Sequence, residues 1–214
     1  MAVVGARQGY TRRSQDAWTA GGGLVVFVVS ALIASSGTVG SPERAVFRAI
    51  NGLPDGISPP MVAAQYLGTL VVGPIVVAVA LVFRHWRLAG AAGVATLLKL
   101  ASERGVKMIV HRQRPGTTVP GAVLRGDVPP KGWSFVSGHV ILTGALAMVV
   151  TPYLPGRWKV LPWVLVGAVA FARVYLGAHN PLDVTGGLGL GLAIGGLLNM
   201  AFGVPETAPA DAST

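Results

Sequence analysis

The chain has 214 residues, of which 52% are hydrophobic and 12% are charged, and its mean hydropathy is +0.61. Soluble domains carry about 25% charged residues, so this composition argues against a soluble domain and favours a single helix bundle inside a bilayer. The net charge of +9 is scattered over short loops, which argues against nucleic acid and favours anionic lipid headgroups and phosphorylated substrates as partners.

Six apolar segments are each long enough to cross a bilayer, for which about 20 mostly apolar residues are needed. They cover residues 18–36, 61–83, 88–109, 138–153, 160–176 and 181–202. The sequence therefore predicts an all-α, six-span transmembrane helix bundle over residues 18–203. A polar cytoplasmic N-terminus (1–17) would precede it, and a disordered tail (204–214) would follow it.

The stretch "SPERAVFRAINGLPDG" between the first two segments predicts a short helix that lies at the membrane surface. Ser41 is the expected N-cap, with Glu43 in the first turn. Val46, Phe47 and Ile50 would form its apolar face. Its expected role is anchoring, and the alternative is that it guides a lipid substrate sideways.

The basic residues of the short loops predict the orientation. With the N-terminus inside, the cytoplasmic segments hold Arg7, Arg12, Arg13, Arg84, Arg87, Arg157 and Lys159. The bases between Arg112 and Lys131 would then lie outside, against the usual tendency, unless they serve a site. We therefore expect a multi-pass plasma (inner) membrane protein with both termini cytoplasmic and a site at the extracytoplasmic face. The long loop 116–133 would cover that site, and a flexible connector is the alternative.

The stretch "KMIVHRQRP" places Lys107 and Arg114 seven residues apart, so both cations share one face if the helix persists. Lys99 and Glu103 extend this face at four-residue intervals, and Glu103 would pair with Lys107. The alternative is a basic collar whose side chains reach the lipid headgroups.

The stretch "WSFVSGHVILTGALAMVV" begins the fourth segment. Ser137 would cap this helix, Gly138 would let a ligand approach the backbone, and His139 lies in the first turn. A helix N-terminus presents unpaired N–H groups and about half a positive charge, which suits a phosphate. The alternative is an ordinary helix cap with an incidental histidine.

The stretch "RVYLGAHNPLD" begins the sixth segment, with Asn180 as N-cap and Pro181 at the first helical position. Asp183 in the first turn would accept the Nδ1–H of His179, which leaves Nε2 free to act as a nucleophile or base. Arg173 would offer a forked donor to phosphate oxygens. The alternative is a structural ion pair between Arg173 and Asp183.

Together the three stretches contain the groups that phosphoryl transfer requires, namely cations for the phosphate oxygens, a nucleophile and a proton donor. The 8 acidic residues are spread widely and the chain has no cysteine, so neither a metal site nor any other cofactor is expected.

The order and internal spacing of these stretches resemble the three-part motif of the type 2 phosphatidic acid phosphatase superfamily, in its integral-membrane branch. The resemblance implies that His179 attacks phosphorus and forms a phosphohistidine, that Asp183 orients it, and that His139 protonates the departing oxygen. It also implies that the phosphate is held by Lys107, Arg114, Ser137, Gly138 and Arg173.

Two positions depart from the family pattern. The residue before Ser-Gly-His is usually proline and is Val136 here, which affects only the approach of the chain. The residue before Arg173 is usually serine and is Ala172 here, so one phosphate donor is missing. Neither change removes a group that the chemistry requires.

We therefore expect a membrane phosphatase that hydrolyses a phosphomonoester or diphosphate on a lipid, with a polyprenyl phosphate or diphosphate favoured. Phosphatidic acid and phosphatidylglycerol phosphate are alternative substrates. A noncatalytic lipid-phosphate binding or transport protein is the alternative of another class, although it would not need both His139 and His179. The sequence does not set the oligomeric state, because Gly187, Gly191 and Gly195 can pack within the bundle or between chains.

Overall fold

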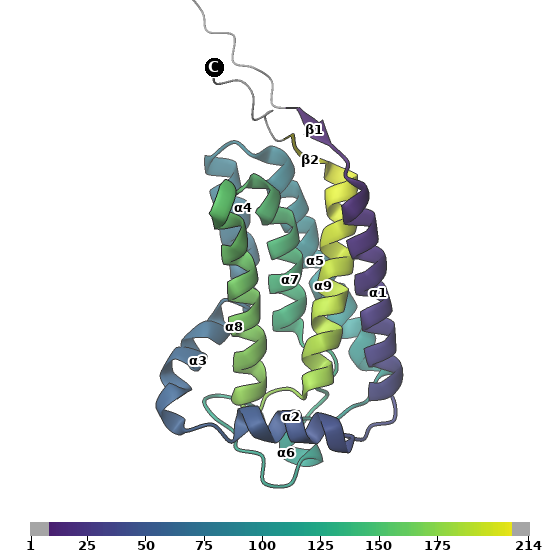
Figure 1. The fold of residues 1–214 in the computed structure, drawn as a ribbon, viewed down its shortest axis with the longest axis vertical. Helices are drawn as coiled ribbons and strands as arrows, with labels where there is room; N and C mark the ends of the chain where they lie inside the picture. Colours follow the sequence, from purple (N-terminus) through teal and green to yellow (C-terminus); the bar gives the residue numbers. More distant parts are fainter. Residues whose placement is uncertain (1–8, 207–214) are drawn as a thin grey trace, which may run out of the picture.

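The structure is a computed structural model that describes residues 9–206. This part of the chain forms a helix bundle, in agreement with the predicted all-α class (Figure 1). Two strands of two residues each pair as a small antiparallel sheet at one end of the bundle. The elements are β1 (Tyr10–Thr11), α1 (Ser14–Ala34), α2 (Ser41–Asn51), η1 (Asp55–Ile57), α3 (Ser58–Tyr66), α4 (Val72–Val82), α5 (Trp86–Ile109), α6 (Pro115–Thr118), α7 (Gly138–Val150), η2 (Thr151–Tyr153), η3 (Gly156–Val160), α8 (Leu161–Tyr175), α9 (Pro181–Phe202) and β2 (Val204–Pro205).

Five of the predicted apolar segments form helices near the expected positions, namely α1, α5, α7, α8 and α9. The prediction of one continuous helix over residues 61–83 is wrong, because α3 ends at Tyr66 and α4 begins at Val72. Pro74 has no N–H to donate to the carbonyl of Leu70, and Gly68 has a low helix propensity. The break places Gly68 directly against His139, where an added Cβ would lie 2.6 Å from the Cβ of the histidine.

Three helical segments are long and apolar enough to cross a membrane, namely Ser14–Ala34, Gly156–Tyr175 and Pro181–Phe202. Two shorter apolar helices cover Val72–Val82 and Gly138–Tyr153. The helix α5 is longer than any of these, but ionisable residues such as Lys99, Glu103 and Lys107 interrupt its apolar surface.

The helix α9 packs against α1 on one side and α7 on the other (Figure 1), and glycines allow both contacts. A Cβ added to Gly187 or Gly191 would lie 2.8 Å from the Ser137 carbonyl oxygen or 2.7 Å from that of Ile141, and Gly195 is as tightly packed against α7. These three glycines therefore pack within the chain, as the intramolecular alternative predicted.

The helix α2 lies across the ends of α8 and α9 (Figure 1). Its N-cap is Gly40 and not the predicted Ser41, which is the first helical residue. Phe47 is fully buried and Ile50 packs against the same apolar cluster, whereas Val46 is 49% exposed. The predicted apolar face is therefore only partly correct, and its buried part attaches α2 to the bundle.

The loop before α7 is attached to α2 and to the end of α8. The Asn51 side-chain amide donates to the carbonyls of Val123 and Tyr175, at 2.8 Å each, and accepts the N–H of Val123. The Arg125 guanidinium donates to the carbonyls of Asn51, Leu53 and Tyr175. These bonds hold the loop in place, which disfavours the alternative of a flexible connector.

The opposite end of the bundle carries β1 and β2, in which Tyr10 pairs with Pro205 and Thr11 with Val204. The predicted disordered tail therefore does not begin at residue 204, because Val204 and Pro205 are paired. The rest of that tail, 207–214, lies outside the described residues, as does Arg7.

Close packing of α1 on α9 can be tested with two adjacent glycines. A Cβ at Gly23 would lie 2.6 Å from the carbonyl oxygen of Gly189, whereas a Cβ at Gly22 would have nothing within 4 Å. We expect Gly23→Val to destabilise the protein by about 1–3 kcal/mol through overpacking, and Gly22→Val to have little effect. Thermal unfolding in detergent measures both, and equal midpoints for the two variants would contradict this packing.

Candidate active site

The three predicted motif stretches meet at the end of the bundle that carries α2 and α6 (Figure 1). Lys107 is in the last turn of α5, and Arg114 is in the loop that follows. Ser137, Gly138 and His139 begin α7, Arg173 is in the last turn of α8, His179 follows α8, and Asp183 is in the first turn of α9. All eight predicted site residues therefore lie at the same end of the bundle.

His179 faces Asp183 through the predicted ring nitrogen. Its Nδ1 lies 3.6 Å from Asp183 Oδ2, which is too long for a hydrogen bond, and Nδ1 has no hydrogen-bond partner among the described residues. The same carboxylate oxygen accepts the backbone N–H of Asn180 at 2.8 Å, which caps the first turn of α9. The predicted orientation is thus present, but the predicted hydrogen bond is not formed.

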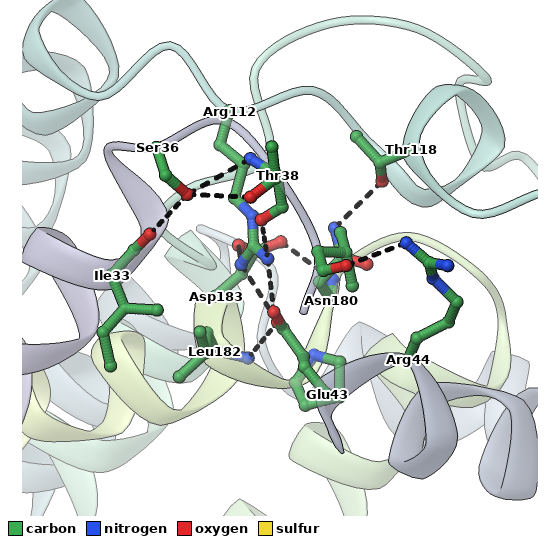
Figure 2. A network of polar contacts seen from close by, with 12 residues as sticks. Ile33, Ser36, Thr38, Glu43, Arg44, Arg112, Thr118, Asn180, Leu182 and Asp183 are labelled. Atoms are coloured by element: carbon green, nitrogen blue, oxygen red, sulfur yellow. Dashed lines mark hydrogen bonds and ion pairs between the residues drawn. The ribbon is translucent and has the colours of Figure 1, made fainter. Parts of the chain in front are cut away.

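The cation that pairs with Asp183 is Arg112 and not Arg173. Arg112 Nη1 lies 3.2 Å from Asp183 Oδ1 and 3.0 Å from Glu43 Oε1, and Nη2 donates to Thr38 and to Glu43 (Figure 2). Burial alone would lower the pKa of the fully buried Arg112, but the hydrogen bonds that it donates to Glu43 and the charge of Asp183 raise its pKa above the ordinary value for arginine. The alternative of a structural pair between Arg173 and Asp183 is therefore wrong.

Glu43 joins α2 to the start of α9 (Figure 2). Its Oε1 accepts the backbone N–H of Leu182 at 2.9 Å, so the carboxylate satisfies one of the free donors at the N-terminus of α9. Sequence reasoning missed the roles of both Arg112 and Glu43. The signal for Arg112 was its place inside the first motif, whereas Glu43 was expected only in the first turn of α2 and nothing in the sequence linked it to α9.

Three predicted cations surround His179. Arg114 Nη1 donates to the carbonyl of Ala178 at 2.8 Å, next to the histidine, and Arg173 Nη1 donates to the side chain of Gln65 on α3. Burial, followed by the charges of Arg173, Arg114 and Lys107, lowers the pKa of His179 well below 6.5. The imidazole is therefore neutral at neutral pH, which is the form that a nucleophile requires.

The N-terminus of α7 faces the same site. Ser137 is the N-cap residue, but its side chain makes no capping hydrogen bond, so that part of the prediction is wrong. Its hydroxyl oxygen is buried and has no partner among the described residues. His139 lies close enough to His179 and Arg173 for their charges to act on its ring. The free hydroxyl and the N–H groups of the first turn are available to an anion.

The carboxylate of Glu103 lies beside the N-terminus of α7. Glu103 pairs with Lys107 at 2.5 Å, as predicted, and with Lys99 at 2.7 Å. Its Oε2 lies only 2.0 Å from where a Cβ on Gly138 would be. The site therefore accommodates negative charge between α5 and α7, next to the cations predicted to hold phosphate.

The family model described as the PAP2 superfamily matches residues 84–203, which include all eight predicted site residues. The chain belongs to this superfamily. It is 36% identical over 123 residues to the decaprenylphosphoryl-5-phosphoribose phosphatase of Mycobacterium tuberculosis, a match that covers 56% of this chain and 63% of that protein. It is 30% identical over 119 residues to the undecaprenyl-diphosphatase of Sulfolobus acidocaldarius, covering 54% of this chain and 56% of that protein. The aligned residues thus cover less than two thirds of the length of either relative.

Two solved structures share the fold. LpxE of Aquifex aeolicus superimposes with a TM-score of 0.67 at 22% identity, over 72% of this chain and 92% of its own. A transmembrane PAP2-type phosphatidylglycerolphosphate phosphatase from Bacillus subtilis has a TM-score of 0.62 at 22% identity, over 83% of this chain and 94% of its own. At this identity the two structures establish the PAP2 fold of the bundle.

The buried ion pairs of Arg112 can be tested by removing the cation. We expect Arg112→Gln to destabilise the protein by about 3–5 kcal/mol, because it leaves Glu43 and Asp183 buried without a counter-charge. The measurement is thermal or denaturant unfolding in detergent, with the exposed Lys131→Gln as control. In the double variant with Glu43→Gln, the losses should be less than additive. An unchanged unfolding midpoint for Arg112→Gln would show that these ion pairs do not stabilise the fold.

Proposed function

We propose that this PAP2 protein is a membrane phosphatase that hydrolyses a phosphomonoester or diphosphate on a lipid, with a polyprenyl carrier favoured. One observation carries the proposal, which is that the buried His179 faces Asp183 through Nδ1 and lies next to the carbonyl that Arg114 binds, while burial and the charges of Arg173, Arg114 and Lys107 lower its pKa. A neutral nucleophile amid fixed cations is the environment that attack on a phosphate dianion requires.

In the proposed mechanism, Nε2 of His179 attacks phosphorus and forms an N–P bond as the bond to the lipid oxygen breaks. His139 gives its proton to the departing oxygen. The Nδ1–H of the resulting phosphohistidine faces Asp183, whose carboxylate is fixed by Arg112 and by the N–H of Asn180. His139 then takes a proton from the water whose oxygen attacks phosphorus, the N–P bond breaks, and phosphate leaves with His139 protonated and His179 neutral again.

The phosphate would be held from two sides. Lys107, Arg114 and Arg173 neutralise its equatorial oxygens, while the hydroxyl of Ser137 and the N–H of Gly138 bind it at the start of α7. The unpartnered Ser137 hydroxyl supports this assignment. We propose no metal in this mechanism, because the cations and the two histidines can supply the charge, the nucleophile and the proton that the reaction requires.

We propose the six-span, N-in topology with the site at the extracytoplasmic face of the plasma membrane. The three helices apolar enough to span a membrane support the membrane location, although not the number of spans. The orientation is supported by the bases at the end opposite the site, where Arg12 donates to the Met200 carbonyl and Arg87 to that of Phe202. In this arrangement α2 lies at the outer interface, the 116–133 loop covers the site, and α3 with α4 forms the broken second span.

The names of the two relatives support a prenyl-linked phosphate as substrate. Phosphatidic acid and phosphatidylglycerol phosphate remain alternatives, because each carries a terminal phosphate that the same cations would bind. A noncatalytic lipid-phosphate binding or transport protein is the rival of another class. It is disfavoured because it would need the cations but not a pair of histidines at the same site.

Loss of the nucleophile gives the direct test. We expect His179→Ala to abolish phosphate release from lipid phosphates while the unfolding midpoint stays near that of the wild type, because Nδ1 of the ring has no hydrogen-bond partner within residues 9–206. The measurement is phosphate release by purified protein in detergent, across prenyl and glycerol lipids of matched charge. His85→Ala, at the far end of α5, is the control. Near wild-type hydrolysis by His179→Ala would mean that another residue attacks phosphorus.

The lowered pKa of His179 predicts a pH dependence. The neutral ring persists below pH 6.5, so the acid limb of kcat/KM should lie below that pH, within a bell-shaped profile that belongs to the coupled site. Arg114→Gln removes a charge that disfavours the protonated ring, so the pKa should rise and the limb should move to higher pH. Comparing the two profiles with one substrate cancels the titration of the substrate. An unmoved acid limb would contradict this assignment.

A further inference from the structure

A groove of about 790 Å³ runs along the outer face of α5 beside the candidate active site. Its apolar lining includes Leu97, Leu100 and Met108, and its polar lining includes Arg104 and His111. Leu97 and Leu100 lie toward the middle of α5, whereas Arg104, Met108 and His111 lie toward the end that carries the site, so the basic lining groups are near the site.

The groove is continuous with the candidate active site. Lys107 and Glu103 line the groove and also belong to the site, since Glu103 lies against Gly138 at the start of α7. A lipid whose terminal phosphate lies at Lys107 therefore has space for its remaining part along α5. The order of residues along the helix places Arg104 one turn further from the site end than Lys107.

Arg104 differs from the two neighbouring lysines of α5 in its contacts. Lys99 and Lys107 both pair with Glu103, whereas Arg104 makes no ion pair or side-chain hydrogen bond within residues 9–206. Arg104 and Lys107 are three residues apart on one helix face, so their Cβ atoms are about 5–6 Å apart. The Arg104 side chain is exposed in the groove, so an anion that enters the groove can reach its guanidinium.

The outer side of the groove has a fixed wall. The ring of Trp133 lies against that of His111, with the centroids 4.8 Å apart, and the Trp133 backbone is bridged to Gln113. Both rings line the groove. Their contact holds an imidazole and an aromatic face at the level of the site, above the apolar floor of the groove.

We propose that Arg104 and His111 bind a second phosphate group of the lipid substrate, the one that is not transferred, while the lipid chain follows Leu100 and Leu97 along α5. This inference rests on the proposed function and narrows its substrate class to lipids with two phosphates. The two phosphates are bonded directly in a diphosphate, or a sugar separates them. Both arrangements place a second anion beyond the phosphate that His179 attacks.

The test compares Arg104→Gln with the wild type on three prenyl lipids of equal chain length. These are a monophosphate, a diphosphate and a phosphosugar that carries a terminal phosphate. A lost charge-assisted hydrogen bond should raise KM for one or both lipids with two phosphates by about tenfold or more, while KM for the monophosphate changes less than about twofold. The lipid whose KM rises shows which spacing between the two phosphates the site binds. Arg48→Gln, an exposed base on α2, is the matched control.

An equal effect of Arg104→Gln on all three lipids would mean general attraction of anions, and no effect on any would mean no contact; either result overturns the proposal. Binding to His179→Ala separates this inference from the proposed function, because no turnover is needed. If the wild type hydrolyses none of the lipids, tighter binding of a two-phosphate lipid that depends on Arg104 still supports the subsite. Equal binding of the monophosphate and both two-phosphate lipids overturns it.

Discussion

The fully buried Arg112 guanidinium holds the candidate site together. It lies between Glu43 of α2 and Asp183 of α9, and it comes from the loop after α5, so one cation joins three parts of the chain (Figure 2). Removing the charge of Arg112 would leave the carboxylates of Glu43 and Asp183 buried without a counter-charge, so these three side chains depend on one another. Asp183 in turn faces His179, so the orientation of the proposed nucleophile depends on a side chain that need not touch the substrate.

The sequence predicted the elements of the site better than the contacts between them. The spacing of Lys107, Ser137 and His179 from their helix ends placed each group correctly, because caps and apolar periods are local signals. Arg112 lies 69 residues from Glu43 and 71 from Asp183, and Arg173 lies 108 residues from Gln65. Pairs separated this far leave no periodic pattern. The break between α3 and α4 is a different case, because Gly68 and Pro74 are local signals that the apolar run 61–83 outweighed in the prediction.

The carboxylate of Glu103 affects the electrostatics of the site. Three cations near one imidazole repel one another, so an anion-binding site made of them destabilises the fold while no anion is bound. The carboxylate of Glu103 lies between Lys99 and Lys107 and reaches the start of α7, so it offsets part of that repulsion. The remaining positive charge is on Arg114 and Arg173, which are held by the Ala178 carbonyl and the Gln65 amide oxygen, both uncharged acceptors. Among the three cations proposed to bind phosphate, these two guanidinium groups therefore lack a carboxylate partner, whereas Lys107 has one.

The helix α5 differs from its neighbours for a physical reason that joins the site to the groove. It has the length of a membrane span but carries Lys99, Glu103, Arg104 and Lys107 within about two and a half turns. Ionisable groups in such a helix persist when they face one another or a ligand. Glu103 accounts for both lysines, and the contacts within residues 9–206 leave Arg104 in the groove without a charged partner. Arg104 is therefore the cation of α5 that the proposed second phosphate would neutralise.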